Sequence, residues 1–347
     1  MMCPWKAQRV RSRVFTTQAW ELHFCFSSLS HKCYLPVLNC GPSAAKTEAA
    51  TRLSPRPFKT GFMEQTLTKL SYFLWSALRF PLADAACPGC HGQNTYLLHR
   101  KYLVTALYRC RDCMLMFRVP KGDPEQSARF YQSAYNEGFT TDCPSREQLQ
   151  AFLECGFAGT EKEYSTYIKV LQAAGVRPGM RVLDFGCSWG YGSWQLRKAG
   201  YEVLSYEVSN PRARYAETML GCALAEPAKL DGTIDCFFSA HVLEHFDRPR
   251  DLWKLAYRTL KPDGIVATFV PNGCLDRKEV HSIWGHVHPL LIDADGLRAM
   301  AASCGFTGRC YSLPYNLAEI QSGSSGSSLR GDELVIIAQK IASFALC

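Results

Sequence analysis

The chain has 347 residues and a net charge of +8, and its seventeen cysteines are scattered along it. This length predicts one large domain with a smaller one beside it, and the scattered cysteines exclude the dense disulfide framework of a small secreted protein. No apolar run of roughly 18 residues occurs, so no membrane-spanning helix is expected.

The positive charge is concentrated at the N-terminus. Residues 1–60 contain nine Lys/Arg and two Asp/Glu, and the rest of the chain is close to neutral. Residues 61–347 therefore lack the excess of basic residues that is typical of a nucleic-acid-binding domain. We expect residues 1–62 to form a disordered extension, either an Arg-rich targeting peptide or a translated region upstream of a start at Met63. The scattered aromatics and cysteines favour the second interpretation.

Residues 63–86 are predicted to contain a helix, because apolar side chains recur at helical spacing between Glu64 and Phe80. We expect this helix to pack on the rest of the protein. Its apolar surface with Lys69 and Arg79 also allows weak peripheral contact with a membrane.

Two C-x-x-C units, Cys87/Cys90 and Cys110/Cys113, are separated by 19 residues and predict a zinc ribbon over residues 87–118. Two short strands are expected between them. Four thiolates complete a tetrahedral site with no open position, so the Zn²⁺ would be structural. His91 is an alternative ligand beside Cys90.

A helical linker or lid is predicted for residues 119–165, and a domain of alternating strands and helices for residues 166–345. Within these regions we expect helices over 123–134 and 146–174. A serine- and glycine-rich loop over 321–329 precedes the last strand. The expected strands lie near 181–185, 202–206, 222–225, 234–239, 264–270, 307–313 and 333–339.

The strand near 181–185 ends at Asp184 and is followed by Gly186, Gly190 and Gly192. This spacing differs from the G-x-G-x-x-G turn that receives a pyrophosphate. An acid before the first glycine would repel phosphate but can pair with the ammonium group of S-adenosylmethionine (SAM). Glu207 ends the next strand, where an acid can accept hydrogen bonds from ribose hydroxyls. We therefore predict SAM binding by these residues, with close backbone approach at the glycines.

The segment from Asp184 to Gly192 resembles motif I of class I SAM-dependent methyltransferases. Residues 234–245 and 260–272 resemble their fourth strand and their "LKPGG" turn with the fifth strand, although Asp263 replaces one glycine. The resemblance covers about residues 163–340. It implies an α/β, Rossmann-like sheet of seven strands, the last of them antiparallel. Ser239 ends the fourth strand, and its backbone is expected to touch the cofactor because ligands bind at the carboxyl edge of such a sheet.

The segments 116–120 and 130–135 resemble the linker that follows the ribbon in zinc-ribbon methyltransferases. Many of those enzymes act in glycan, lipid or secondary-metabolite pathways. By analogy, this favours a small-molecule, glycan or lipid acceptor.

His241, Glu244 and His245 follow the fourth strand and are predicted to share one face of a helix that starts there. His245 is the candidate general base and His241 the alternative. Their other interpretations are a structural hydrogen bond of His245 to a neighbouring loop and a divalent-metal site formed by all three residues.

A second histidine cluster follows the fifth strand and contains His281, His286 and His288. His286 or His288 is expected to reach the substrate, and Trp284 to offer it a flat face. The alternative is a loop held by its own aromatics. In the glycine turn, Trp189 is expected to pack on the cofactor and Cys187 to fill space.

These observations predict a cytoplasmic SAM-dependent methyltransferase with a structural Zn²⁺, acting by O-methylation on a small-molecule, glycan or lipid acceptor. One alternative is an rRNA or tRNA methyltransferase with a zinc ribbon, which the near-neutral core disfavours. Another is a non-catalytic SAM-binding module that recruits a partner. A nicotinamide oxidoreductase is disfavoured by the glycine spacing.

Overall fold

The computed structural model describes residues 70, 72–122, 142–276, 280–285 and 287–341. The predicted extension 1–62, the first turns of the helix from Glu64, the helix over 123–134 and His286 lie outside these residues. The side chain of His281 is also outside them.

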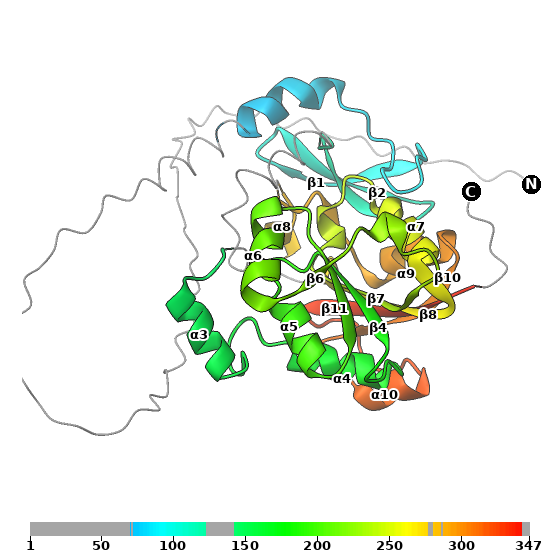
Figure 1. Ribbon diagram of the computed structural model, residues 1–347. Helices are drawn as coiled ribbons and strands as arrows, with labels where there is room; N and C mark the ends of the chain where they lie inside the picture. The colour runs from blue at the N-terminus through cyan, green and yellow to red at the C-terminus, as the bar shows by residue number, and fades with distance from the viewer. Residues whose placement is uncertain (1–69, 71, 123–141, 277–279, 286, 342–347) are drawn as a thin grey trace, which may run out of the picture. The chain divides into compact units, whose positions relative to one another are not determined.

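The larger part of the described chain is built on a seven-stranded sheet with the order β10-β11-β8-β7-β4-β5-β6 (Figure 1). Strand β11 runs antiparallel to both of its neighbours, and the other pairs are parallel. This confirms the predicted Rossmann-like methyltransferase sheet with an antiparallel last strand. The strands are β4 (Arg181–Phe185), β5 (Glu202–Tyr206), β6 (Ala223–Leu224), β7 (Ile234–Ala240), β8 (Leu260–Pro271), β10 (Phe306–Ser312) and β11 (Glu333–Lys340).

Helices cover both faces of this sheet, so its central strands are continuously apolar rather than alternating. Side chains of α4, α5 and α10 share one core with Val182, Phe238 and Val335. Side chains of α7 and α9 share the other core with Phe237 and Ile336. The helices are α3 (Arg146–Glu154), α4 (Ser165–Ala173), α5 (Tyr191–Lys198), α6 (Asn210–Leu220), α7 (Pro249–Thr259), α8 (Val280–Ile283), α9 (Ala294–Ser303) and α10 (Leu317–Ser322).

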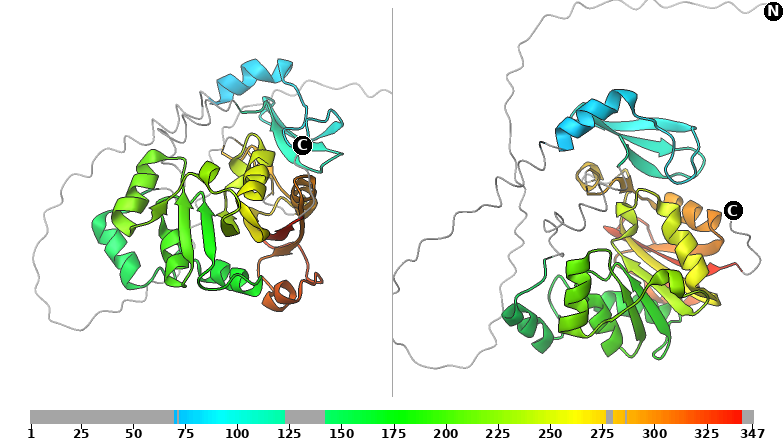
Figure 2. Two further views of the ribbon diagram at one scale, coloured as in Figure 1. Left: turned by 45° about the vertical axis from the view of Figure 1, so that its right-hand side comes forward. Right: turned by 45° about the horizontal axis from the view of Figure 1, so that its top comes forward.

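A second, smaller sheet has the order β1-β2-β3-β9, with each pair antiparallel (Figure 2). Its first three strands are β1 (Thr95–Lys101), β2 (Thr105–Cys110) and β3 (Met116–Val119). Its fourth strand, β9 (Leu290–Leu291), comes from the segment after β8, and Met116 pairs with Leu291. Sequence spacing predicted β1 and β2, between the cysteine pairs, but neither β3 nor β9.

The helix predicted to start at His241 is absent at that position. Strand β7 ends at Ala240, His241 has a left-handed backbone with φ 56°, and a single 3-10 turn follows at Leu243–His245. Helix α7 begins only at Pro249, whose fixed φ favours the first helical position. A left-handed residue cannot lie inside an α-helix, so the predicted shared helical face does not form.

Candidate functional site

The glycine turn between β4 and α5 is shaped by close contacts within the protein. Gly186 and Gly190 have φ values of 84° and 91°, which favour glycine. An added Cβ would lie 2.4 Å from a methyl carbon of Val242 at Gly186 and 2.8 Å from the Cβ of Ala216 at Gly190. At Gly192 it would clash with the ring of Tyr164. The glycines are thus required by packing as well as by any ligand, which the spacing alone did not indicate.

Asp184 ends up inside the protein rather than on an open surface. It is 1% exposed, and its Oδ2 accepts a hydrogen bond of 2.6 Å from the Ser193 hydroxyl. Ser205 in turn donates to Ser193 over 2.8 Å. Burial raises the pKa of Asp184 to about 7, because desolvation penalises the carboxylate. Direct pairing with an ammonium group would therefore require this network to open.

Glu207 stands just past the carboxyl end of β5, beside the glycine turn. Its two oxygens accept backbone hydrogen bonds from Ser188 (2.9 Å) and Ser209 (2.8 Å). Burial raises the pKa of Glu207, although these bonds and Arg212 oppose the shift. The Ser188 hydroxyl is buried next to it and makes no hydrogen bond with any described residue. A carboxylate with spare lone pairs next to an unpaired hydroxyl fits a ligand that carries its own hydroxyl groups, such as the ribose of SAM.

The remaining residues predicted for the cofactor site are buried in the core. The Ser239 side chain is fully buried and donates to Thr268, so only its backbone remains for a ligand. Trp189 is also fully buried and packs against Phe157 and Tyr191, which does not match its predicted place against the cofactor. Cys187 is buried, and burial raises the pKa of its thiol well above the usual range.

His241 belongs to a polar cluster that the sequence did not predict. Its Nε2 lies 2.6 Å from Oε2 of Glu333. The same oxygen accepts a hydrogen bond from the Tyr167 hydroxyl (2.7 Å), and Oε1 accepts one from the Tyr315 hydroxyl (2.6 Å). Burial disfavours the imidazolium, but Glu244 and Glu333 outweigh it and raise the pKa of His241 to about 10. A histidine charged at neutral pH is a poor general base. Nothing in the pattern around Glu333 indicated this role.

Glu244, His245 and His288 lie together beside the end of β7. One carboxylate oxygen and one nitrogen of each ring lie within 4.8 Å of one another, and the two rings are 4.6 Å apart. Burial lowers the pKa of His245, although Glu244 opposes the shift, so burial favours the neutral form of this ring. Of the predicted catalytic histidines, His245 and His288 thus lie together, whereas His241 is hydrogen-bonded to Glu333.

The second histidine segment supports the small sheet. Trp284, predicted to face the substrate, is 1% exposed and packs with Leu107, Met116 and Leu291. The alternative prediction of an aromatic anchor is the one that fits. The loop after β8 therefore presents His288 while Trp284 fixes it to the ribbon.

Four cysteines come together at one end of the small sheet. The sulfurs of Cys87, Cys90, Cys110 and Cys113 all lie within 4.8 Å of one another. Four sulfurs around Zn²⁺ at about 2.3 Å would be separated by roughly 3.8 Å, so the cluster fits a tetrahedral zinc site. The Gly89 N–H donates to the Cys87 sulfur over 3.3 Å. His91 is not part of the cluster.

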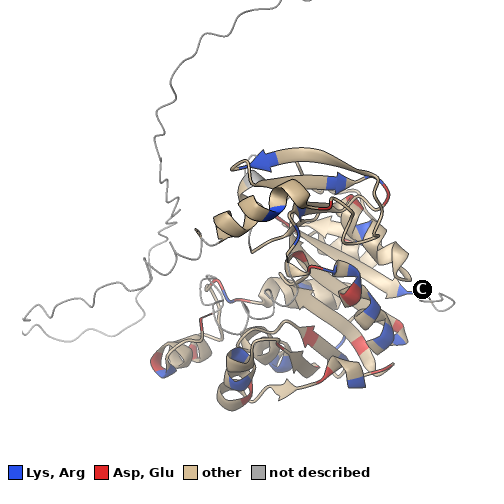
Figure 3. Cartoon of the chain, turned by 90° about the horizontal axis from the view of Figure 1, so that it is seen from above, with Lys and Arg blue, Asp and Glu red and all other residues tan. Residues whose placement is uncertain are grey.

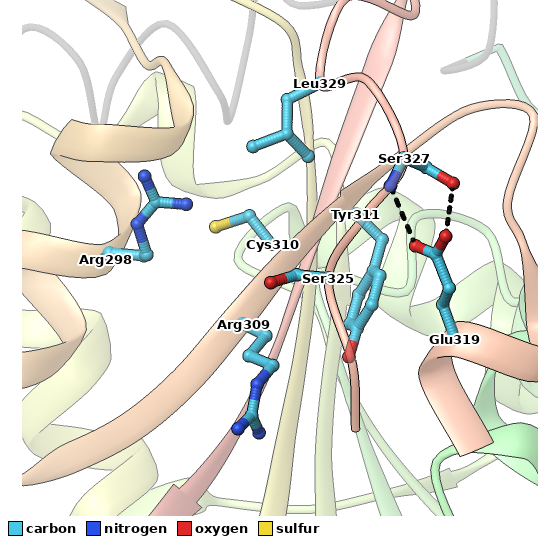
Figure 4. Close-up of a pocket in the computed structure, with 8 residues that line it drawn as sticks. All are labelled: Arg298, Arg309, Cys310, Tyr311, Glu319, Ser325, Ser327 and Leu329. Atoms are coloured by element: carbon cyan, nitrogen blue, oxygen red, sulfur yellow. Dashed lines mark hydrogen bonds between the residues drawn. The ribbon is translucent and has the colours of Figure 1, made fainter. Parts of the chain in front are cut away.

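Charge and shape elsewhere on the described chain do not suggest a nucleic-acid site. Basic and acidic residues are interspersed along the chain in Figure 3. A cavity of about 340 Å³ lies by β10 and α10, where Glu319 is already bonded to Ser327 (Figure 4). Strand β10 is at the edge of the sheet, so this cavity is separate from the turn after β4. Among the described residues, no helix is long and apolar enough to cross a membrane.

Part of the chain is similar to a known protein family. Residues 160–311 match a methyltransferase domain family. Cyclopropane mycolic acid synthase 1 of Mycobacterium tuberculosis is 29% identical over 119 residues, which cover 31% of this chain and 41% of that protein. The chain thus matches about two fifths of the length of that curated relative.

Solved structures with a similar fold include a geranyl diphosphate C-methyltransferase from Streptomyces coelicolor, in complex with Mg²⁺, geranyl diphosphate and S-adenosyl-L-homocysteine. Its identity is 18%, its TM-score is 0.43, and the alignment covers 62% of this chain and 97% of that chain. A SAM-dependent methyltransferase from Archaeoglobus fulgidus is 17% identical with a TM-score of 0.41, over 55% of this chain and 99% of that chain.

Proposed function

We propose that this protein transfers the methyl group of SAM to an oxygen of a small-molecule, glycan or lipid acceptor, because residues 160–311 match a methyltransferase domain family. The observation that carries the proposal is Glu207 at the end of β5, beside the unpaired hydroxyl of Ser188. Glu207 would receive the ribose hydroxyls. The backbone of the glycine turn and of Ser239 would surround the rest of the cofactor.

The chemistry requires alignment of three atoms and removal of one proton. The acceptor oxygen attacks the methyl carbon, the bond from that carbon to sulfur breaks, and the sulfonium keeps the electron pair as a neutral thioether. Orientation of the reacting atoms can supply roughly 7–11 kcal/mol of the barrier. The hydroxyl proton needs a base, and His245, whose pKa is lowered, is better suited than His241, whose pKa is raised to about 10.

We further propose that the four cysteines bind one structural Zn²⁺. The support is the mutual approach of four sulfurs at the end of a small sheet. Thiolates bind zinc tightly, and four of them leave no position for a substrate. The ion would hold the ribbon together and take no part in methyl transfer.

The proposal is tested by calorimetric titration of S-adenosylhomocysteine into the full chain. Glu207→Gln should weaken binding roughly 10- to 100-fold, because hydrogen bonds to a charged group are lost. The matched control is Glu202→Gln at the other end of β5, an exposed acid paired with Arg181, which should bind like the unaltered protein.

Absence of binding to the folded protein would reject the methyltransferase proposal. If binding is found, small-molecule, glycan and lipid acceptors are screened with labelled SAM, together with RNA. Label transferred to RNA alone, or only to carbon or nitrogen of an acceptor, would contradict the proposed substrate class or the proposed acceptor atom.

A further inference from the structure

Glu244, His245 and His288 form a set of one carboxylate and two imidazoles whose donor atoms lie within 4.8 Å of one another. We propose that these three side chains bind a divalent metal ion of the first transition row. The site is separate from the four-cysteine cluster and uses a different kind of ligand. It replaces the grouping of His241, Glu244 and His245 that the sequence suggested as a metal site.

The carboxylate of Glu244 is buried in a way that favours a bound cation. Glu244 is 3% exposed, and neither oxygen makes a hydrogen bond with a described residue. The nearest cationic group is Nδ1 of His241, 3.5 Å from Oε1. This ion pair engages only one of the two oxygens, and His241 is also bonded to Glu333, so Oε2 has no partner among the described residues. A buried carboxylate with unused lone pairs is costly unless a cation satisfies it.

The orientation of the two histidines is the second argument. Nδ1 of His245 lies 2.9 Å from the carbonyl oxygen of Val287, and Nδ1 of His288 lies 2.9 Å from that of Ile283. A carbonyl oxygen can only accept a hydrogen bond, so each ring donates its Nδ1 proton there, and Nε2 is the atom that could coordinate an ion. Metal-binding histidines are typically held in this way by a backbone carbonyl.

The ligand set decides which ions suit the site. Two imidazoles and one carboxylate are typical of Zn²⁺ in sites with an open position and of other first-row ions. Mg²⁺ and Ca²⁺ prefer oxygen ligands only. His245 and His288 are only partly buried, so the ion would retain coordination positions for water or for a substrate oxygen.

The site gives the ion a role that rests on the proposed function. An acceptor hydroxyl bound to the ion would lose its proton more readily, as bound water does, and the proton would pass to solvent. The resulting oxygen anion would attack the methyl carbon of SAM, whose sulfur leaves with the electron pair. His245 would then be a ligand in place of a base. The acceptor class narrows to molecules with a hydroxyl that can bind a metal.

The test is to count zinc in the full chain after dialysis against micromolar free Zn²⁺. The unaltered protein should hold about two ions per chain, and Glu244→Gln and His288→Ala should each hold about one. The matched control changes the residue type of Glu244 at an exposed position, Glu226→Gln, and should retain about two.

Cobalt loading identifies which site is lost. In Glu244→Gln and His288→Ala, the intense thiolate-to-cobalt bands of the four-cysteine site should remain, while weaker ligand-field bands disappear. One zinc in the unaltered protein, or two in both variants, would overturn the proposal. Titration of S-adenosylhomocysteine into the same samples separates the outcomes. Cofactor binding with one zinc rejects only the metal site, and two zincs without cofactor binding rejects only the methyltransferase function.

Discussion

The ribbon and the seven-stranded sheet differ in how they place polar groups in their interiors. In the ribbon, the four cysteine sulfurs lie next to one another, so each thiol contacts other thiols. In the large sheet, Asp184 and Glu244 are single buried carboxylates without a facing lysine or arginine among the described residues. The ribbon is expected to depend on one ion for its stability. The sheet has apolar cores on both faces and can therefore tolerate buried charges near its functional edge.

Removal of zinc should have the largest effect and should act on the ribbon. Cys113→Ser removes one of four ligands, and binding of a structural zinc contributes directly to folding free energy. We expect loss of the ion and a decrease of several kcal/mol in the stability of the ribbon, measured by zinc content and by denaturant unfolding.

The control for this substitution is Cys155→Ser, an exposed cysteine outside the cluster, which should retain zinc and stability. Because β9 belongs to the ribbon sheet, Cys113→Ser should also disturb the loop that carries His288. A ribbon that stays folded without zinc would remove the main difference between the two regions.

The buried carboxyl group of Asp184 in the large sheet should make the stability of the protein depend on pH. The pKa of Asp184 is raised to about 7 in the folded protein, from 3.8. The folded state therefore holds a proton that the unfolded chain releases, and stability decreases as pH rises from about 4 to 7. Relative to Asp184→Asn, the unaltered protein should lose on the order of 4 kcal/mol over this range, measured by urea unfolding at several pH values.

Asp235→Asn in β7 is the control of opposite sign. Burial alone would raise the pKa of Asp235, but hydrogen bonds from Lys261 and the Arg181 N–H outweigh it and lower the pKa. This carboxylate therefore adds stability that is lost as the pH falls below its ordinary range. If Asp184→Asn and Asp235→Asn changed the pH dependence of stability in the same direction, the Asp184 carboxylate would be stabilised by a cation.

The smallest effect is expected where the two regions meet. Arg109 of β2 donates to Asp293 over 2.8 Å, with side chains 12% and 15% exposed. Asp293 also caps α9 by accepting a hydrogen bond from Gly296. Arg109→Leu should destabilise the protein by about 1–2 kcal/mol, because it leaves a partly buried carboxylate unpaired. Denaturant unfolding measures the change.

Asp295→Asn, an exposed acid in the first turn of α9, serves as the control and should change stability by no more than about 0.5 kcal/mol. If Arg109→Leu had an equally small effect, the ion pair would not help to join ribbon and sheet.

The sequence predicted the features that depend on neighbouring residues. The C-x-x-C spacing indicated which cysteines meet, and the apolar runs indicated the strands of the large sheet. The position of Glu207 beside the glycine turn followed from its place directly after a strand. In each case a short stretch of chain contains the physical reason.

The predictions that were wrong concern residues whose surroundings are formed by segments distant in the sequence. Trp189 and Trp284 were assigned to ligands because nothing local shows that Phe157 or Leu107 would cover them. The helix at His241 failed because its left-handed backbone follows from contacts with other strands: its N–H donates to the Phe269 carbonyl in β8. His288 meets Glu244 only because the loop after β8 folds back, and no spacing rule spans that distance.

The pairing of β3 with β9 affects the order in which the chain can fold during synthesis. The cysteines and β3 are made early, but Leu290 and Leu291 follow roughly 170 residues later, about ten to thirty seconds at ordinary rates of translation. Until then, one edge of β3 has no β9 partner, and such an edge can pair with another chain. Completion of the N-terminal ribbon sheet therefore has to wait until five of the seven strands of the large sheet have been made.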